Sequence, residues 1–239
     1  MKRENVRRTV ITISAFLMPL TIYFISPAVI LMAASEGIIN SSAMIFFILF
    51  IASLFIGRFW CGWLCPTGGL QDAVAAGSRK KASGGWKDYI KFAFFIPWIM
   101  LIFWSFIEAG GIKGADFFYG TEEGIFPEIL YVYLVILIAV TILTFALGRR
   151  TFCRYLCPIA VIMIIGRKIG NALHLPGLKL TAVPENCVDC GRCDSACSMG
   201  LPVSKMVKEN KTENRECLLC GACVDACKKD AIKIGFGRR

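Results

Sequence analysis

The fold of this chain is decided by residues 187–227, which read CVDCGRCDSACSMGLPVSKMVKENKTENRECLLCGACVDAC. The stretch holds two cysteine quartets with the same spacing, C-x2-C-x2-C-x3-C. Their members are Cys187, Cys190, Cys193 and Cys197, then Cys217, Cys220, Cys223 and Cys227. At this spacing, three close cysteines ligate one 4Fe-4S cluster and the fourth ligates the cluster of the other quartet. We therefore assign cluster one to Cys187, Cys190, Cys193 and Cys227, and cluster two to Cys217, Cys220, Cys223 and Cys197.

Two glycines, Gly191 and Gly221, occupy the same place in each quartet, where a residue without a Cβ lets the backbone approach an inorganic core. A single C-x-x-C would leave zinc sites, disulfides and buried thiols open, whereas two matched quartets disfavour all three. Residues 185–235 resemble the bacterial-type ferredoxins with two 4Fe-4S clusters. That family usually has Pro after the fourth cysteine. Ser198 and Lys228 stand there in this chain, so the local turn and the reduction potentials are expected to differ.

The composition indicates a membrane protein. The 239 residues are 56% hydrophobic with a mean hydropathy of +0.62, which is too apolar for an ordinary soluble domain. The net charge is +10, but the basic residues lie beside apolar runs, so we attribute them to a membrane surface and expect no nucleic acid partner. Four uncharged runs are candidates for membrane-spanning helices, namely 9–35, 37–57, 92–107 and 129–148. The expected fold is an α-helical bundle of four transmembrane helices (1–178) followed by a small α+β ferredoxin-like domain (179–239).

The charges of the loops predict the orientation of this bundle. The loops around 36–42 and 108–128 carry Lys113 as their only Lys or Arg. The other loops and the segment after the fourth run are basic, with Arg58, Arg79, Lys80, Lys81, Lys87, Arg149, Arg150 and Arg154. Both termini and the clusters are therefore expected on the cytoplasmic side of the cell membrane, where thiols stay reduced. Residues 158–166 are too few to cross and are expected to lie at the interface or under the bundle.

A second repeat follows the second and fourth uncharged runs. Residues 59–66 read FWCGWLCP and residues 151–158 read TFCRYLCP, so each copy contains C-x3-C-P. We interpret the membrane part as a duplicated two-helix hairpin, and cysteines at i and i+4 face the same way on a helix. The cysteines concerned are Cys61, Cys65, Cys153 and Cys157.

If the hairpins pack about a pseudo-twofold axis, these four thiols meet. Four thiolates are the ligand count for a third, shared 4Fe-4S cluster, and also for zinc or Cu(I). The alternative is two thiol pairs that act separately or only pack. Four arginines nearby would offset the negative charge of a shared centre: Arg58, Arg149, Arg150 and Arg154. Of these, we take Arg58, Arg149 and Arg154 as candidates for cofactor binding.

Uncharged runs, two C-x3-C-P motifs and two ferredoxin quartets in this order resemble the NapH-type membrane ferredoxins. The C-terminal halves of the NosR and CcoG (FixG) families are similar. The resemblance covers nearly the whole chain, without the extra domains of NosR and CcoG. It implies electron transfer at the membrane, commonly from quinol, through clusters on the cytoplasmic side, and redox work for the two C-x3-C-P motifs.

Three functions remain open. The leading one is an oxidoreductase subunit of the quinol dehydrogenase type, which passes electrons between the membrane quinone pool and a partner protein in a larger complex. The second is a non-catalytic anchor, relay or assembly subunit, and the third is a cupric reductase of the CcoG type. No catalytic residue and no direction of electron flow follow from the sequence. His174 is the only histidine and no nucleotide-binding loop is present, so neither haem nor nucleotide is expected.

Two further sets of residues are candidates for contacts with quinone and with a protein. Aromatic residues that could border a quinone, or simply anchor the chain at the interface, are Trp60, Trp63, Trp98, Trp104 and Tyr155. The region 186–211 is basic and would steer an acidic redox partner, or form a solvated face beside the membrane. Its charges come from Arg192, Lys205, Lys208 and Lys211, with Arg215 close by.

Overall fold

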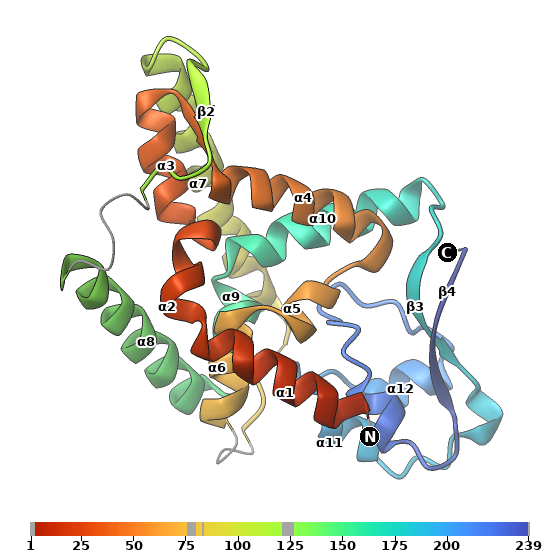
Figure 1. Ribbon diagram of the computed structural model, residues 1–239. Coiled ribbons are helices and arrows are strands. Elements are labelled where there is room, and N and C mark those ends of the chain that lie inside the picture. The colour runs from red at the N-terminus through yellow and green to blue at the C-terminus, as the bar shows by residue number, and fades with distance from the viewer. Residues whose placement is uncertain (1–2, 76–79, 83, 121–126, 239) are drawn as a thin grey trace.

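The computed structural model describes residues 3–75, 80–82, 84–120 and 127–238. Arg79, one of the loop charges used above, lies outside these residues. The chain forms a helical part and a small ferredoxin part that lies beside one end of it (Figure 1). The helical part holds both C-x3-C-P motifs, and the ferredoxin part holds both cysteine quartets.

The first uncharged run is broken into several short helices. These are α1 (Arg3–Phe16), α2 (Met18–Thr21), the 3-10 helix η1 (Ile22–Ile25) and α3 (Pro27–Glu36). Pro19 lies in the first turn of α2 and Pro27 begins α3, because proline fits a helix start but interrupts a helix interior. The chain bends by 65° between α1 and the segment Met18–Ile25. The sequence predicts that Pro19 and Pro27 kink one continuous helix over this run, whereas in the structure both prolines lie at helix starts.

The rest of the helical part contains two copies of a long helix followed by a short helix and a further helix. The first copy is α4 (Ser41–Ile56), α5 (Phe59–Trp63) and α6 (Pro66–Val74), and the second is α8 (Pro127–Leu147), α9 (Thr151–Tyr155) and α10 (Pro158–Ala172). Between them lie η3 (Trp86–Tyr89) and α7 (Ile90–Glu108). The short strands β1 (Ile38–Asn40) and β2 (Gly114–Asp116) pair in parallel.

The prediction of four transmembrane helices is wrong. Among the described residues, the continuous segment Trp86–Glu108 is long and apolar enough to cross a membrane, and the bent pair of α1 and Met18–Ile25 qualifies only if it counts as one span. The second run loses its first residues to β1, which leaves 16 residues for α4. Sixteen residues span about 24 Å, less than the roughly 30 Å of a hydrocarbon core. The fourth run forms α8, in which the apolar helix found among the described residues is Leu134–Leu147.

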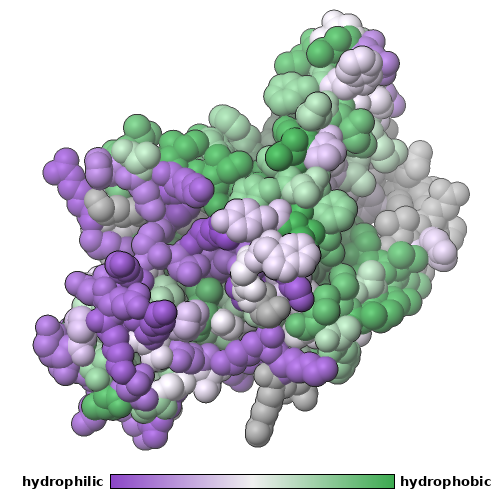
Figure 2. All heavy atoms as spheres, turned by 180° about the vertical axis from the view of Figure 1, so that it is seen from behind, coloured by the Kyte–Doolittle hydropathy of each residue, from purple (hydrophilic) through white to green (hydrophobic). Residues whose placement is uncertain are grey.

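Helix α7 is nevertheless exposed in a way that the core helix of a soluble protein is not. Only 11% of the residues in the apolar stretch of the segment Trp86–Glu108 are buried. Large apolar side chains such as Phe94, Met100, Phe103 and Ile107 are more than half exposed along it. Hydrophobic residues cover much of the visible helical part, whereas hydrophilic residues dominate the ferredoxin part (Figure 2). An exposed apolar surface of this kind marks contact with a membrane or with another protein.

Helix α10 packs closely against α4, and two glycines make this approach feasible. A Cβ at Gly166 would lie 1.9 Å from the Ser53 hydroxyl oxygen, and a Cβ at Gly170 would lie 2.3 Å from the Leu54 carbonyl oxygen. The segment 158–166 therefore belongs to a 15-residue helix that packs inside the helical part. Of the two expectations for this segment, packing under the bundle describes α10 better than an interfacial position does.

The ferredoxin part is built from a two-stranded sheet, one 3-10 helix and three short α-helices. Strand β3 (Gly177–Ala182) pairs antiparallel with β4 (Ile232–Gly237), in register from Gly177 with Gly237 to Ala182 with Ile232. Between the strands lie η4 (Pro184–Asn186), α11 (Arg192–Ala196), α12 (Val203–Lys208) and α13 (Ala222–Ala226). The sheet closes the ends of the segment that carries both quartets.

Helix α1 ties the N-terminus to the ferredoxin part and to the first C-x3-C-P motif. Arg3 forms an ion pair with Asp225 at 3.0 Å, and the Glu4 amide donates to the Asp225 carboxylate at 3.1 Å. Further along the helix, Arg7 donates to the Gly62 carbonyl oxygen at 3.1 Å. Figure 1 shows the N-terminus beside the ferredoxin helices accordingly.

Candidate iron-sulfur sites

The two cysteine quartets have the same backbone course. Gly191 and Gly221 each adopt a left-handed conformation, with φ of 67° and 80°, immediately before α11 and α13. Asp189 and Leu219, each one residue before the second cysteine, share a φ of 52°. Glycine adopts left-handed backbone angles without the steric cost that a side chain brings, which favours glycine at positions 191 and 221. The repeat in the sequence is therefore also a repeat in local structure.

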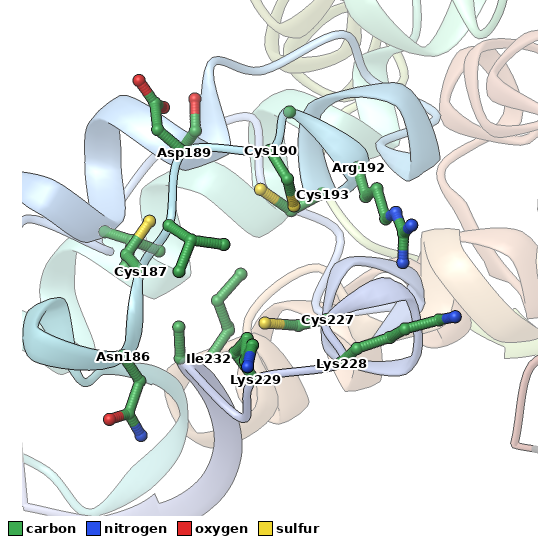
Figure 3. Close-up of a pocket in the computed structure, with 15 residues that line it drawn as sticks. Asn186, Cys187, Asp189, Cys190, Arg192, Cys193, Cys227, Lys228, Lys229 and Ile232 are labelled. Atoms are coloured by element: carbon green, nitrogen blue, oxygen red, sulfur yellow. The ribbon is translucent and has the colours of Figure 1, made fainter.

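The cysteines assigned to cluster one surround one cavity. The cavity has a volume of about 280 Å³, and Cys187, Cys190, Cys193 and Cys227 all line it. Cys227 comes from the second quartet and approaches from the side opposite Cys187 and Cys190 (Figure 3). Cys190 is exposed at the edge of the site.

The cysteines assigned to cluster two line a second, narrower cavity: Cys197, Cys217, Cys220 and Cys223. Burial, together with the neighbouring Cys220 and Cys197, raises the pKa of the Cys217 thiol to about 12. The Ser198 hydroxyl in this cavity is buried without a hydrogen-bond partner among the described residues. A hydroxyl in that position fits a cluster, because the sulfides of a cluster accept hydrogen bonds.

The cysteine geometry suits a polynuclear cluster better than a single ion. Within the described ranges, no three His, Cys, Asp or Glu side chains converge as the ligands of one metal ion. Zinc needs its sulfur ligands at about 2.3 Å from one atom. A 4Fe-4S cluster instead binds each cysteine through a different iron, so four sulfurs spread around a cavity match it.

The two C-x3-C-P motifs are nearly identical in backbone. Cys65 and Cys157 have φ, ψ of −68°, 119° and −68°, 118°, and each is the N-cap of the helix that Pro66 or Pro158 begins. Their amides donate to Trp60 and Phe152 at 3.0 Å in both copies. The two thiols of a motif thus come from a short helix and from the N-cap of the next helix, and the expectation of one shared helical face is wrong.

Contacts between the motifs are reciprocal. The Arg58 guanidinium donates to the Cys153 carbonyl oxygen at 3.3 Å, and the Arg150 guanidinium donates to the Cys61 carbonyl oxygen at 2.6 Å. The Gln71 amide donates to the Cys153 sulfur at 3.1 Å. Met163, which stands at the place of Gln71 in the second copy, has its sulfur 3.5 Å from the Cys61 sulfur. Each copy therefore touches the first cysteine of the other, as a pseudo-twofold arrangement requires.

All four motif cysteines are buried and close enough to influence one another. Burial raises the pKa of the Cys65 thiol, and so do Cys153, Cys61 and Cys157. Burial, Cys153 and Cys61 likewise raise the pKa of Cys157 to about 12. Thiols that are hard to ionise in isolation become ligands when a metal displaces their protons. The four residues predicted to share a centre are thus buried and influence one another, and the shared centre itself stays a prediction.

The three arginines predicted to bind a cofactor, Arg58, Arg149 and Arg154, make different contacts around these cysteines. Arg58 is fully buried and pairs with Glu216 at 2.8 Å. Arg154 pairs with Asp88 at 2.6 Å and also donates to the Met199 carbonyl oxygen. Arg149 has a buried Nε with no hydrogen-bond partner among the described residues. Only Arg58 of these three touches the backbone of a motif cysteine.

Four residues around the motifs escaped the sequence reasoning: Gln71, Asp72, Met163 and Glu216. Burial alone would raise the pKa of Asp72, but Arg150 and Arg7 hold it at about 2, so the carboxylate stays charged. One signal was available for Gln71 and Met163, because each stands six positions after the second cysteine of its motif. The ion pairs of Asp72 with Arg150 and of Glu216 with Arg58 join segments far apart in the chain, so no local sequence pattern predicts them.

Family models match both cysteine-bearing parts. A family described as a 4Fe-4S binding domain matches residues 41–83 and 129–176, one match for each C-x3-C-P copy. A family described as a 4Fe-4S dicluster domain matches residues 186–232. Both kinds of repeat identified in the sequence thus fall within 4Fe-4S families.

Curated relatives cover most of this chain. The putative electron transport protein YccM of Escherichia coli is 29% identical, over 79% of this chain and 54% of YccM. The nitrogen fixation protein FixG of Rhizobium meliloti is 25% identical, over 80% of this chain and 41% of FixG. The ferredoxin-type protein NapH of Haemophilus influenzae is 25% identical, over 74% of this chain and 62% of NapH.

The chain therefore spans about half the length of YccM and less of FixG. No solved structure matches it. The NapH similarity and the two 4Fe-4S families nevertheless agree with the resemblance drawn from the motifs. They confirm that this chain is similar to the NapH-type 4Fe-4S ferredoxins.

Proposed function

We propose that this protein is a membrane-attached iron–sulfur protein that carries electrons between quinone and a protein partner. The observation that carries the proposal is that each quartet contributes its fourth cysteine to the cavity of the other quartet. Cys227 joins the first quartet around one cavity and Cys197 joins the second around the other. When bound, the two 4Fe-4S clusters supply one-electron carriers.

The four motif cysteines are proposed to hold a third centre shared by both copies. Their burial, their mutual influence on pKa and their reciprocal contacts support one site rather than two separate pairs. The match of a 4Fe-4S binding family to both copies favours an Fe–S cluster over zinc. Arg58 and Arg150 donate to the backbone of this site and offset the charge of thiolate ligands.

Attachment to the membrane is proposed to involve α7. Lys91, in its first turn, is buried and pairs with Glu216 at 2.5 Å, so the ferredoxin part lies at that end of the helix. The cytoplasmic side remains the proposed location of the clusters, on the loop charges and the need for reduced thiols.

Quinone contact is proposed at the first motif. Trp60 and Trp63 each have a buried indole N–H without a hydrogen-bond partner among the described residues, and a quinone carbonyl oxygen would accept from it. The Trp98 indole already donates to the Pro27 carbonyl oxygen, and Trp104 is mostly exposed. These two, like the buried Tyr155, are weaker candidates.

The test is metal analysis and redox titration of the full chain in membranes under anaerobic conditions. Iron and acid-labile sulfide should reach at least about eight of each per chain, from two 4Fe-4S clusters. The EPR signals of the reduced clusters should appear on addition of a quinol analogue. Cys190→Ser should remove one cluster, whereas the exposed Ser195→Ala should remove none. A zinc-loaded native protein without Fe–S absorbance would rule the proposal out.

A second function, reduction of Cu(II), is favoured by one observation. The Met163 thioether lies beside the Cys61 sulfur, and soft sulfur ligands from Cys and Met select Cu(I). This function would require Cu(II) reduction that depends on Cys61, Cys65, Cys153 and Cys157. Met163→Leu should then weaken copper binding while leaving the iron content unchanged.

A further inference from the structure

The backbone of the first C-x3-C-P motif lies directly against the second ferredoxin cavity. Gly62, between Cys61 and Cys65, is buried. A Cβ at Gly62 would lie 2.9 Å from the Leu218 carbonyl oxygen and 3.3 Å from the Cys220 Cβ. At these distances, even the methyl group of alanine would push the motif and the Leu218–Cys220 segment apart. Glycine is therefore required for the motif to approach Cys220, a proposed ligand of cluster two.

Other contacts between the helical part and the ferredoxin part converge on the same cavity. Arg154, which stands at the place of Gly62 in the second motif, donates to the Met199 carbonyl oxygen at 2.6 Å. Met199 is buried and lines the cavity of cluster two. Arg58 pairs with Glu216, the residue before Cys217. Both motifs thus contact the walls of this cavity.

The cavity of cluster one, by contrast, is bordered by exposed residues. Cys190 is exposed, and Val188 is 63% exposed. Lys228 and Lys229 line the same cavity and are exposed, as is Arg192. By contrast, Lys208 of the predicted basic region pairs with Asp189 and Arg215 lies over the Tyr89 ring of the helical part. Three exposed cations, Arg192, Lys228 and Lys229, therefore lie at the edge of cluster one.

We propose that Gly62 is the point at which electrons cross between the C-x3-C-P part and the ferredoxin part. Cluster two is then the inner centre, and cluster one is the outer centre, which meets the protein partner at Arg192, Lys228 and Lys229. Each crossing moves one electron, so one side is oxidised and the other reduced, and no bond or proton changes at Gly62. This inference rests on the proposed function and takes a quinol as the electron donor and an oxidised redox protein as the acceptor.

The first test compares Gly62→Ala with Gly235→Ala in the full chain carrying its clusters. A Cβ at Gly235 meets no atom within 4 Å, so this variant is the matched control. Both variants should retain the iron content and the EPR signals of the dithionite-reduced protein. Reduction by a quinol analogue should slow on the order of tenfold in Gly62→Ala, since small misplacements carry large rate effects. Wild-type rates in Gly62→Ala would overturn the inference.

The second test examines the order of the clusters without using quinol. Cys220→Ser should leave cluster one, and Cys190→Ser should leave cluster two, each reduced with dithionite. A soluble paramagnetic lanthanide complex should then relax the EPR signal of the first variant far more than that of the second. Equal or reversed relaxation would overturn the inner and outer assignment. If this order holds but quinol reduces neither cluster in the unmodified protein, the assumed donor is wrong and the inferred order stands.

Discussion

The two C-x3-C-P copies share a backbone but differ in what surrounds them. In the first copy, Arg58 reaches across to Glu216 of the ferredoxin part. In the second copy, the equivalent Arg150 pairs with Asp72 inside the helical part. Likewise, a hydrogen-bond donor, Gln71, faces one cysteine and a thioether, Met163, faces the other. The duplication has kept the cysteine geometry and has changed the environment, so Arg58 links its copy to the ferredoxin part whereas the equivalent Arg150 links two helices of the helical part.

The largest expected effect comes from removing the cysteines of one copy. Cys61→Ser with Cys65→Ser, and Cys153→Ser with Cys157→Ser, should each lose the whole shared centre, or about four iron atoms per chain. Iron analysis and EPR of the full chain would measure this loss, with Ser35→Ala as the control. An unchanged iron content in both double variants would mean that the two copies act as separate thiol pairs.

The next effect concerns the two buried arginines. Arg58→Met and Arg150→Met each leave a carboxylate without its main partner, which costs roughly 3–5 kcal/mol when no other cation is near. We expect about 3 kcal/mol for each, near the lower end, because Lys91 and Arg7 remain beside Glu216 and Asp72. Chemical denaturation would measure it.

Hydrogen exchange would separate these two variants further. Arg58→Met should weaken protection of residues 213–219, because it breaks the link to the ferredoxin part, and Arg150→Met should not. Arg8, with a side chain 70% exposed, is the control, and Arg8→Met should be nearly neutral. Equal loss of protection in Arg58→Met and Arg150→Met would contradict the conclusion that Arg58 links to the ferredoxin part and Arg150 to the helical part.

The smallest effect should come from exchanging the residues that face the thiols. Gln71→Met removes the donor to Cys153 and should lower the reduction potential of the shared centre, since hydrogen bonds to sulfur help to set that potential. Met163→Gln adds a donor beside Cys61 and should raise it. Redox titration followed by EPR would give both shifts. Shifts of the same sign would show that the two thiols do not report on one centre.

The sequence predicts the cysteine sets far better than it predicts the spans. Ligand spacing and the repeated C-x3-C-P are local signals. The spacing predicted which cysteines line each of the two cavities, and the repeat pointed to the four buried motif cysteines. Uncharged runs say only where a helix is permitted. Pro19, Pro27 and the pairing of β1 with β2 decided that the first two runs would be cut short. Glu216 and Asp72 were out of reach because their partners lie on other segments.

The contact between Glu4 and Asp225 joins residues 221 positions apart. It therefore cannot form until residue 225 has left the ribosome, which takes on the order of tens of seconds at about 5–20 residues per second. Throughout that time the first helix lacks its final partner, and the ferredoxin segment remains uncovered on that side. The closing of α1 onto the ferredoxin part should accordingly be a late step, after both cysteine quartets have become available for loading.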